Sequence, residues 1–241
     1  MADQPHEDDV VITLRDLLAS LIVYGDGYGI ETPPDWTQGR TLYGGINAAL
    51  CLEVAMRDCP GLPQLRSAQL CFVGPASGWL TLRANLLRQG RSSAIVEVEC
   101  RTAESVAAKA LLTFGAGRSS QINHAFMPPP SVPEPDACEP FLVEGRGAPA
   151  FMQHFEMRLA AGARPFGRAE NPEFAVWVRH RDARGANAMG ALVGPAGCAP
   201  PATAGRGSRR SRGIRSRRSA WAAAQSRSGD SGMSMLPSRN F

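Results

Sequence analysis

The stretch Thr41-Leu-Tyr-Gly-Gly-Ile-Asn-Ala-Ala-Leu-Cys-Leu-Glu-Val-Ala-Met-Arg-Asp-Cys59 predicts a single helix that is apolar around almost its whole circumference. Only Glu53 and Arg57 are expected to reach solvent. They lie four residues apart with the acid first, a spacing that slightly stabilises a helix. A helix that is apolar on nearly all sides is buried, and this one is too short to span a bilayer. We therefore expect the rest of the chain to enclose it.

The enclosing structure is predicted in the segment between Gln64 and Phe114, where apolar and polar residues alternate in four runs. Alternation with a period of two is typical of half-buried strands, and Gly90 suits a hairpin turn between the second and third runs. A helix wrapped by a curled antiparallel sheet is the hotdog arrangement, so we predict an α+β hotdog fold. The four runs are residues 64–73, 79–87, 92–101 and 106–114.

The chain of 241 residues is long enough for two small domains, and its composition divides it into four parts. We predict an N-terminal hotdog domain over residues 10–118 and a proline-rich linker over residues 119–140. Strand-like runs at 151–159 and 173–180 indicate a partial second hotdog, to which we assign residues 141–187. Residues 188–241, rich in Arg, Ser and Gly, are predicted to form a disordered basic tail.

The positive charge of the chain is concentrated near its C-terminal end. Residues 186–241 hold nine arginines and one acid, Asp230, whereas the formal net charge of the whole chain is only +4. The part before residue 186 is therefore net acidic. The arginines could bind nucleic acid or CoA phosphates by charge alone, but they lack interleaved aromatic residues and any nucleic-acid motif, so a nucleic-acid partner is not expected.

The composition also indicates the cellular compartment of the protein and whether it binds a metal or a cofactor. The chain has no run of about 18 apolar residues, and its acidic start is unlike a signal peptide, so we expect a cytoplasmic protein without a membrane partner. The six cysteines have no metal-ligand spacing, and we expect neither a metal nor a cofactor. Cys51, Cys71 and Cys100 are interpreted as small buried hydrophobic residues.

Several segments together resemble the bacterial thioesterase II-type acyl-CoA thioesterases, which are double-hotdog proteins. The resemblance runs from about residue 14 to residue 185, and it implies hydrolysis of an acyl-CoA substrate by activated water, with no covalent intermediate and no metal. The matching segments are the glycine-pair helix opening at 40–50, the strand and Pro turn at 66–76, the Arg-Gly hairpin at 87–94, and the paired strands at 155–158 and 177–181.

The second half departs from the family pattern. Its helix should carry a catalytic Asp, and later strands a Thr or Ser and a Gln, but no acid lies between Asp182 and Asp230, and Asp182 comes one element too early. Pro195 and Pro200 would also break the helix. We assign no catalytic residue and hypothesise a shift of reading frame near residue 187. A catalytically inactive module that binds acyl-CoA or a partner subunit is the alternative, followed by nucleic-acid binding through the basic tail.

The start of the buried helix is the predicted substrate-binding site. Gly44 and Gly45 allow a ligand, or a neighbouring backbone, to come close, and free N–H groups at a helix N-terminus favour negative charge. In the family such an N–H polarises the thioester carbonyl. Asn47 could contact the substrate or bond to a neighbouring strand. Tyr43 and Trp36 could line an acyl pocket or pack in the core.

The remaining polar candidates lie in the second half. His154 and Glu156 would share one strand face, where a catalytic pair is possible, but we interpret them as solvent-facing residues of an edge strand. His124 and His180 are likewise interpreted as solvated. An incomplete second hotdog would leave sheet edges and apolar surface uncovered, and we therefore predict a homo-oligomer.

Overall fold

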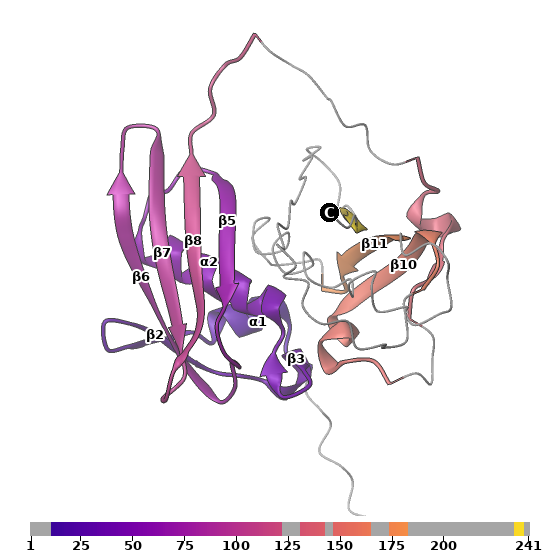
Figure 1. Ribbon diagram of the computed structural model, residues 1–241, viewed down its shortest axis with the longest axis horizontal. Helices are drawn as coiled ribbons and strands as arrows, with labels where there is room; N and C mark the ends of the chain where they lie inside the picture. The colour runs from indigo at the N-terminus through magenta and orange to yellow at the C-terminus, as the bar shows by residue number, and fades with distance from the viewer. Residues whose placement is uncertain (1–10, 122–130, 143–146, 165–173, 183–233, 239–241) are drawn as a thin grey trace, which may run out of the picture.

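The computed structural model describes residues 11–121, 131–142, 147–164, 174–182 and 234–238 (Figure 1). Short 3-10 helices are labelled η. The first half contains α1 (Leu14–Ala19), β1 (Ile22–Tyr24), β2 (Gly27–Glu31), η1 (Pro34–Trp36), β3 (Thr37–Gln38), β4 (Thr41–Leu42), α2 (Gly44–Asp58), β5 (Leu65–Phe72), β6 (Trp79–Gln89), β7 (Ser93–Arg101) and β8 (Val106–Gly115). The second half contains η2 (Pro135–Ala137), β9 (Glu139–Pro140), η3 (Ala150–His154), β10 (Phe155–Gly162), β11 (Phe174–His180) and β12 (Ser234–Ser238).

Helix α2 is the buried helix that the sequence predicts, and most of its residues are inaccessible to solvent. The predicted pair is also formed, because Arg57 Nε lies 2.9 Å from Glu53 Oε1. The same guanidinium donates hydrogen bonds to the backbone oxygens of Leu18 at 2.8 Å and Leu21 at 3.3 Å. Leu18 lies in the last turn of α1, and Leu21 follows the helix by two residues, so Arg57 joins the C-terminal end of α1 to α2.

A six-stranded antiparallel sheet with the order β1-β2-β6-β7-β8-β5 curls around α2 (Figure 1). Central strands pair in register, with Val98 opposite both Ala84 and Ala110. The face toward α2 is apolar and fully buried, whereas Lys109, Glu97 and other ion-paired residues occupy the opposite face. The fold is therefore a hotdog, as the sequence predicts. The buried inner-face residues are Leu80, Leu82, Ala94, Val96, Val98, Cys100, Ala108, Ala110, Leu112 and Phe114.

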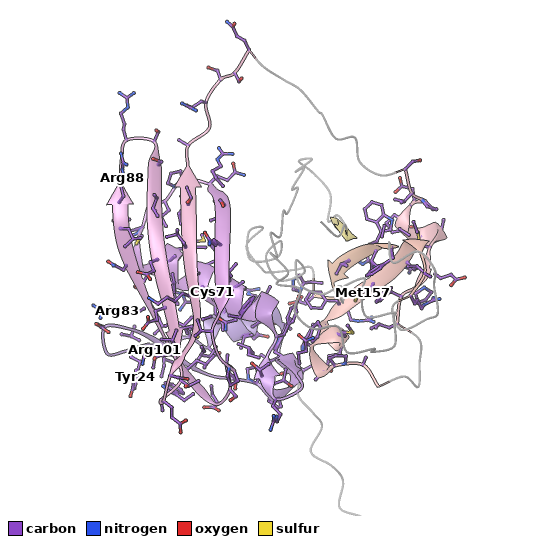
Figure 2. All side chains as sticks on the ribbon, in the orientation of Figure 1. Tyr24, Cys71, Arg83, Arg88, Arg101 and Met157 are labelled. Carbon is purple, nitrogen blue, oxygen red and sulfur yellow. The ribbon has the colours of Figure 1, made fainter. Side chains whose placement is uncertain are left out.

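The cysteines of this domain differ in exposure. Cys51 and Cys100 are buried as predicted, and burial raises the pKa of the Cys100 thiol to about 12. The prediction that Cys71 is buried is wrong, because Cys71 is exposed on β5 (Figure 2). In the described sheet β5 is an edge strand, and its alternate residues face away from α2, so an apolar residue there reaches solvent.

The second half forms a smaller antiparallel sheet with the order β12-β11-β10-β9. Strands β10 and β11 are the two strands that the sequence predicts; Phe155 pairs with His180, and a bulge lies between Leu159 and Ala161. The predicted linker ends in β9, which pairs with β10. The domain boundaries stay a prediction.

Most of the tail predicted to be disordered, residues 188–241, lies outside the described residues. For Ser234–Ser238 the prediction is wrong, because this segment forms β12 and pairs with β11, with Leu236 opposite Val176. Composition averaged over the tail cannot reveal a five-residue strand that gains its backbone hydrogen bonds from a neighbouring strand edge. Among the described residues, no helix is both long enough and apolar enough to cross a membrane.

Candidate functional site at the N-terminus of α2

The first turn of α2 presents two glycine N–H groups that have no hydrogen-bond acceptor within the described part of the chain. Tyr43 has a non-helical backbone, with φ −56° and ψ 131°, and directly precedes Gly44. Its carbonyl accepts hydrogen bonds from the N–H groups of Ile46 at 3.0 Å and Asn47 at 3.1 Å. The N–H groups of Gly44 and Gly45 are thus the unpaired donors that begin every helix, and they suit a developing negative charge.

Gly44 also lies against the ring of Phe72 on β5. A Cβ atom added at Gly44 would lie 3.0 Å from Phe72 Cζ, which is closer than an ordinary contact. The phenylalanine is 58% exposed, so an aromatic face reaches solvent beside the first turn of α2. This geometry supports close packing as one reason for glycine at this position, and it adds Phe72 to the residues around the helix start.

Asn47 is 2% exposed, and its side chain remains within the helix. Its Oδ1 accepts a hydrogen bond from Cys51 Sγ at 3.7 Å, one turn further along α2. Burial raises the pKa of the Cys51 thiol, which keeps this group a neutral donor. The buried amide therefore has a partner on its own helix, which is neither of the two partners considered from the sequence.

Tyr43 lies at the contact between the two halves. It is 1% exposed, and its ring stacks on Phe151 of η3 with centroids 4.0 Å apart and planes 3° apart. Its N–H donates to the carbonyl of Trp36 at 2.9 Å. Of the two alternatives for Tyr43 and Trp36, this arrangement corresponds to aromatic core packing.

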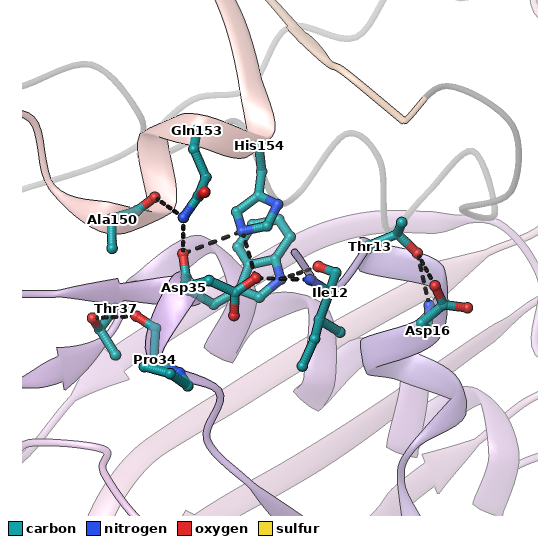
Figure 3. Close-up of polar contacts among 10 residues, drawn as sticks. Ile12, Thr13, Asp16, Pro34, Asp35, Thr37, Ala150, Gln153 and His154 are labelled. Atoms are coloured by element: carbon teal, nitrogen blue, oxygen red, sulfur yellow. Dashed lines mark hydrogen bonds and ion pairs between the residues drawn. The ribbon is translucent and has the colours of Figure 1, made fainter. Parts of the chain in front are cut away.

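Asp35 and His154 form a buried polar pair that local sequence patterns did not predict (Figure 3). His154 Nε2, at the end of η3, is 3.2 Å from Asp35 Oδ2 and 3.2 Å from the Asp35 backbone oxygen. Asp35 Oδ2 also accepts the N–H of Ile12 at 2.8 Å, while Oδ1 is buried and meets no donor in the part of the chain that the structure describes. The side chains of His154 and Asp35 are only 5% and 12% exposed.

The protonation state of His154 follows from its burial. Burial lowers the pKa of the imidazole, and the nearby Asp35 carboxylate opposes this effect only in part. A 3.2 Å contact fits either an ion pair or a neutral N–H donor. Because burial dominates, we treat His154 as a neutral imidazole whose Nε2–H donates to Asp35 near neutral pH.

The interpretation of His154 and His180 as solvated is wrong, since they are 6% and 9% exposed. His154 belongs to a 3-10 turn rather than to a strand face, and the ring of Trp36 covers it. His180 lies 4.6 Å from the ring of Phe155. Glu156 pairs with Arg158 and Arg179 instead of His154. His124 and the basic tail lie outside the described residues.

Two surface hollows lie at the opposite end of α2, and neither is lined by Tyr43, Gly44, Gly45 or Asn47. The more enclosed one has a volume of about 130 Å³. It is mainly apolar, and Cys59 is among the residues that line it. Among the described residues, no three His, Cys, Asp or Glu side chains converge to hold a metal ion. The lining residues are Met56, Cys59, Gly61, Leu62, Pro63, Leu65 and Phe114.

Comparison with protein families matches both halves of the chain. Residues 32–115 match the acyl-CoA thioesterase N-terminal domain, and residues 133–237 match the acyl-CoA thioesterase C-terminal domain. The second match extends through the segment for which we hypothesised a shift of reading frame. A comparison with curated proteins gave no match.

Solved structures share the fold at low sequence identity. A conserved hot dog fold protein from Alicyclobacillus acidocaldarius is 23% identical with a TM-score of 0.72, over 80% of this chain and 72% of that chain. An acyl-CoA thioesterase II TesB2 from Mycobacterium marinum is 17% identical with a TM-score of 0.58, over 77% and 68% of the two chains. The tesB protein of Mycobacterium avium subspecies paratuberculosis is 18% identical with a TM-score of 0.58, over 77% and 69%.

Proposed function

Because the chain belongs to the acyl-CoA thioesterase family, whose N-terminal and C-terminal domain models it matches, we propose that it hydrolyses an acyl-CoA thioester to the free acid and CoA. The observation that carries the proposal is that the N–H groups of Gly44 and Gly45, at the start of a buried helix, have no acceptor among the described residues. Their position at the start of a buried helix supports a role as donors toward the thioester carbonyl, a role that the family resemblance implies.

In the proposed reaction, water attacks the thioester carbon, and negative charge develops on the carbonyl oxygen. Donors at the first turn of α2 would stabilise that charge, because fixed N–H dipoles need no reorganisation during the reaction. Collapse of the intermediate breaks the C–S bond, the acyl group leaves as the acid, and the CoA sulfur takes up a proton. The exposed ring of Phe72 beside Gly44 offers an apolar contact for the acyl or pantetheine part.

A second candidate is acyl-CoA binding without hydrolysis. It is favoured by the absence of any acidic residue from the sequence between Asp182 and Asp230, the segment in which the family resemblance expects a catalytic Asp. Such a module would use the same helix N-terminus to bind the carbonyl, but it would have no carboxylate there to activate water.

One set of measurements on the purified full chain distinguishes hydrolysis of acyl-CoA from binding without hydrolysis. Octanoyl-CoA is added and released thiol is followed with a chromogenic thiol reagent, while calorimetry measures binding of a non-hydrolysable thioether analogue. Thiol release above the uncatalysed rate supports hydrolysis. Analogue binding without release supports the second candidate, and failure of both measurements contradicts the proposed site.

A homo-oligomer is also proposed. Strand β5 is an edge of the described six-stranded sheet, and Phe72 and Val73 at its end are each 58% exposed. Unpaired backbone groups and apolar side chains at a sheet edge favour pairing with another chain. A nucleic-acid partner is not proposed.

A further inference from the structure

Asp35 and His154 connect three segments that are far apart in the sequence. Asp35 lies in η1 and His154 at the end of η3, 119 residues later, while Asp35 Oδ2 also accepts the N–H of Ile12 ahead of α1. Gln153 adds a longer contact from its Nε2 to the Asp35 backbone oxygen at 3.4 Å. These polar contacts therefore fix the position of η3 relative to η1 (Figure 3).

The pair is linked to the start of α2 through Trp36 and Tyr43. The indole of Trp36 stacks on the His154 ring, and its Nε1 donates to the Ile12 backbone oxygen at 2.7 Å. The Trp36 carbonyl accepts the N–H of Tyr43, the residue directly before the two glycines. Three residues before His154, Phe151 stacks on the Tyr43 ring. Segment η3 therefore contacts the residues that precede α2 twice, through His154 on Trp36 and through Phe151 on Tyr43.

Packing alone does not account for a carboxylate at this position. Asp35 Oδ1 is buried and has no hydrogen-bond partner among the described residues, and burying such an oxygen is unfavourable. An apolar pair of similar shape would pack without that cost. The carboxylate instead fixes the orientation of the His154 ring. Its Oδ2 accepts hydrogen bonds from both the imidazole and the Ile12 N–H, and these contacts hold the ring against Trp36.

We propose that Asp35 and His154 are positioning residues for the first turn of α2. They hold η3 against η1, and through Trp36 and Tyr43 they fix the Gly44 and Gly45 N–H groups in the direction of the thioester carbonyl. This inference rests on the proposed function of those groups. Because the imidazole is nearly enclosed and its Nε2 is engaged by Asp35, it acts through Trp36 and Tyr43 rather than on the substrate.

Two substitutions at His154 distinguish the effect of its hydrogen bond from the effect of its aromatic ring. His154→Phe keeps an aromatic ring for Trp36 but removes the donor, whereas His154→Gln keeps a donor that can reach Asp35. Misplacing reacting groups by about 1 Å can cost about 100-fold in rate. We expect His154→Phe to lower kcat about 10- to 100-fold with KM changed less than about threefold, and His154→Gln to retain about a third or more of kcat.

Glu156→Gln is the matched control. Glu156 is two residues further on and forms ion pairs with Arg158 and Arg179 within the second half. Its loss removes a charged contact without altering the contact to η1, so kcat should stay within about twofold of the wild type. Asp35→Asn, which keeps the shape of the side chain, is the second test if His154→Phe does not fold.

A readout that does not depend on activity is amide hydrogen exchange in a peptide covering residues 41–50. Faster exchange in this peptide in His154→Phe, but not in Glu156→Gln, supports the positioning role. This result would hold even if the wild type released no thiol, because missing thiol release contradicts only the proposed hydrolysis. The inference is overturned if His154→Phe changes neither exchange nor kcat. It is also overturned if His154→Gln is as impaired as His154→Phe, or if Glu156→Gln produces the same changes.

Discussion

The imidazole of His154 lies parallel to the indole of Trp36, with ring centroids 3.6 Å apart and planes 3° apart. One ring belongs to each half of the chain. Phe151, Phe155 and Val176 of the second half also belong to the same buried cluster as the residues of α2. The two halves therefore share a core, and we expect them to unfold together rather than as independent domains.

Replacing Trp36 with Ala should destabilise the whole protein. Trp36 is completely buried between the halves, and truncating a buried aromatic residue typically costs about 3–5 kcal/mol. Trp79→Ala is the control, since Trp79 is 38% exposed and should cost about 2 kcal/mol or less. Urea unfolding followed by circular dichroism measures both values. Equal losses, or two separate transitions in the wild type, would contradict the shared core.

The pH dependence of stability should report on His154. Its pKa is lowered below the usual 6.5 by burial, so the unfolded chain binds a proton more readily than the folded one. The stabilising contribution is then complete above pH 6.5 and declines as pH falls from there through the lower folded pKa. The titratable groups packed nearby are Asp35 on η1 and His180 on β11.

The measurement is the free energy of unfolding of wild type and His154→Gln across this pH range. Glutamine cannot take up the proton, so the decline below pH 6.5 should become shallower in the variant. The comparison removes the contributions that the two proteins have in common. Parallel curves would mean that burial of His154 does not depress its pKa.

The sequence predicted those elements of the fold whose apolar residues recur with a local period. Helix α2 and strands β5–β8 were predicted because their apolar residues recur with the period of a buried helix or a half-buried strand. The run 151–159 was predicted as one strand, but Pro149 precedes a 3-10 turn that continues to His154, and β10 begins only at Phe155. That turn directs His154 inward, toward Trp36.

The candidate site was predicted only in part, for a related reason. Gly44, Gly45, Asn47 and Tyr43 stand together in the sequence and could be selected from a single helix. The contact between Asp35 and His154 joins residues 119 positions apart, and no local pattern specifies such a pairing. The sequence offers only that each of the two polar residues stands next to an aromatic one, Asp35 before Trp36 and His154 before Phe155.

Gly44 and Phe72 should be energetically coupled. Alanine is favoured over glycine by about 0.4–1 kcal/mol where the backbone conformation suits both, but a Cβ at Gly44 would lie 3.0 Å from Phe72 Cζ. Gly44→Ala should therefore be neutral or destabilising in the wild type, and stabilising by about 0.5–1 kcal/mol in a Phe72→Ala background. A double-mutant cycle by urea unfolding measures the coupling. Additive effects would show that Phe72 does not restrict this position.

The edge strand β5 should mediate self-association. The wild type is expected to elute as a dimer or larger species, and Cys71→Lys, which adds a charge to the exposed face of the edge, should shift the distribution toward monomer. Leu111→Lys is the matched control, because Leu111 is 39% exposed but lies on β8, which has a neighbour on both sides. Size-exclusion chromatography with light scattering measures the mass. If association uses the edge, only the β5 substitution weakens it; a monomeric wild type, or equal effects of both lysines, would exclude the edge as the contact.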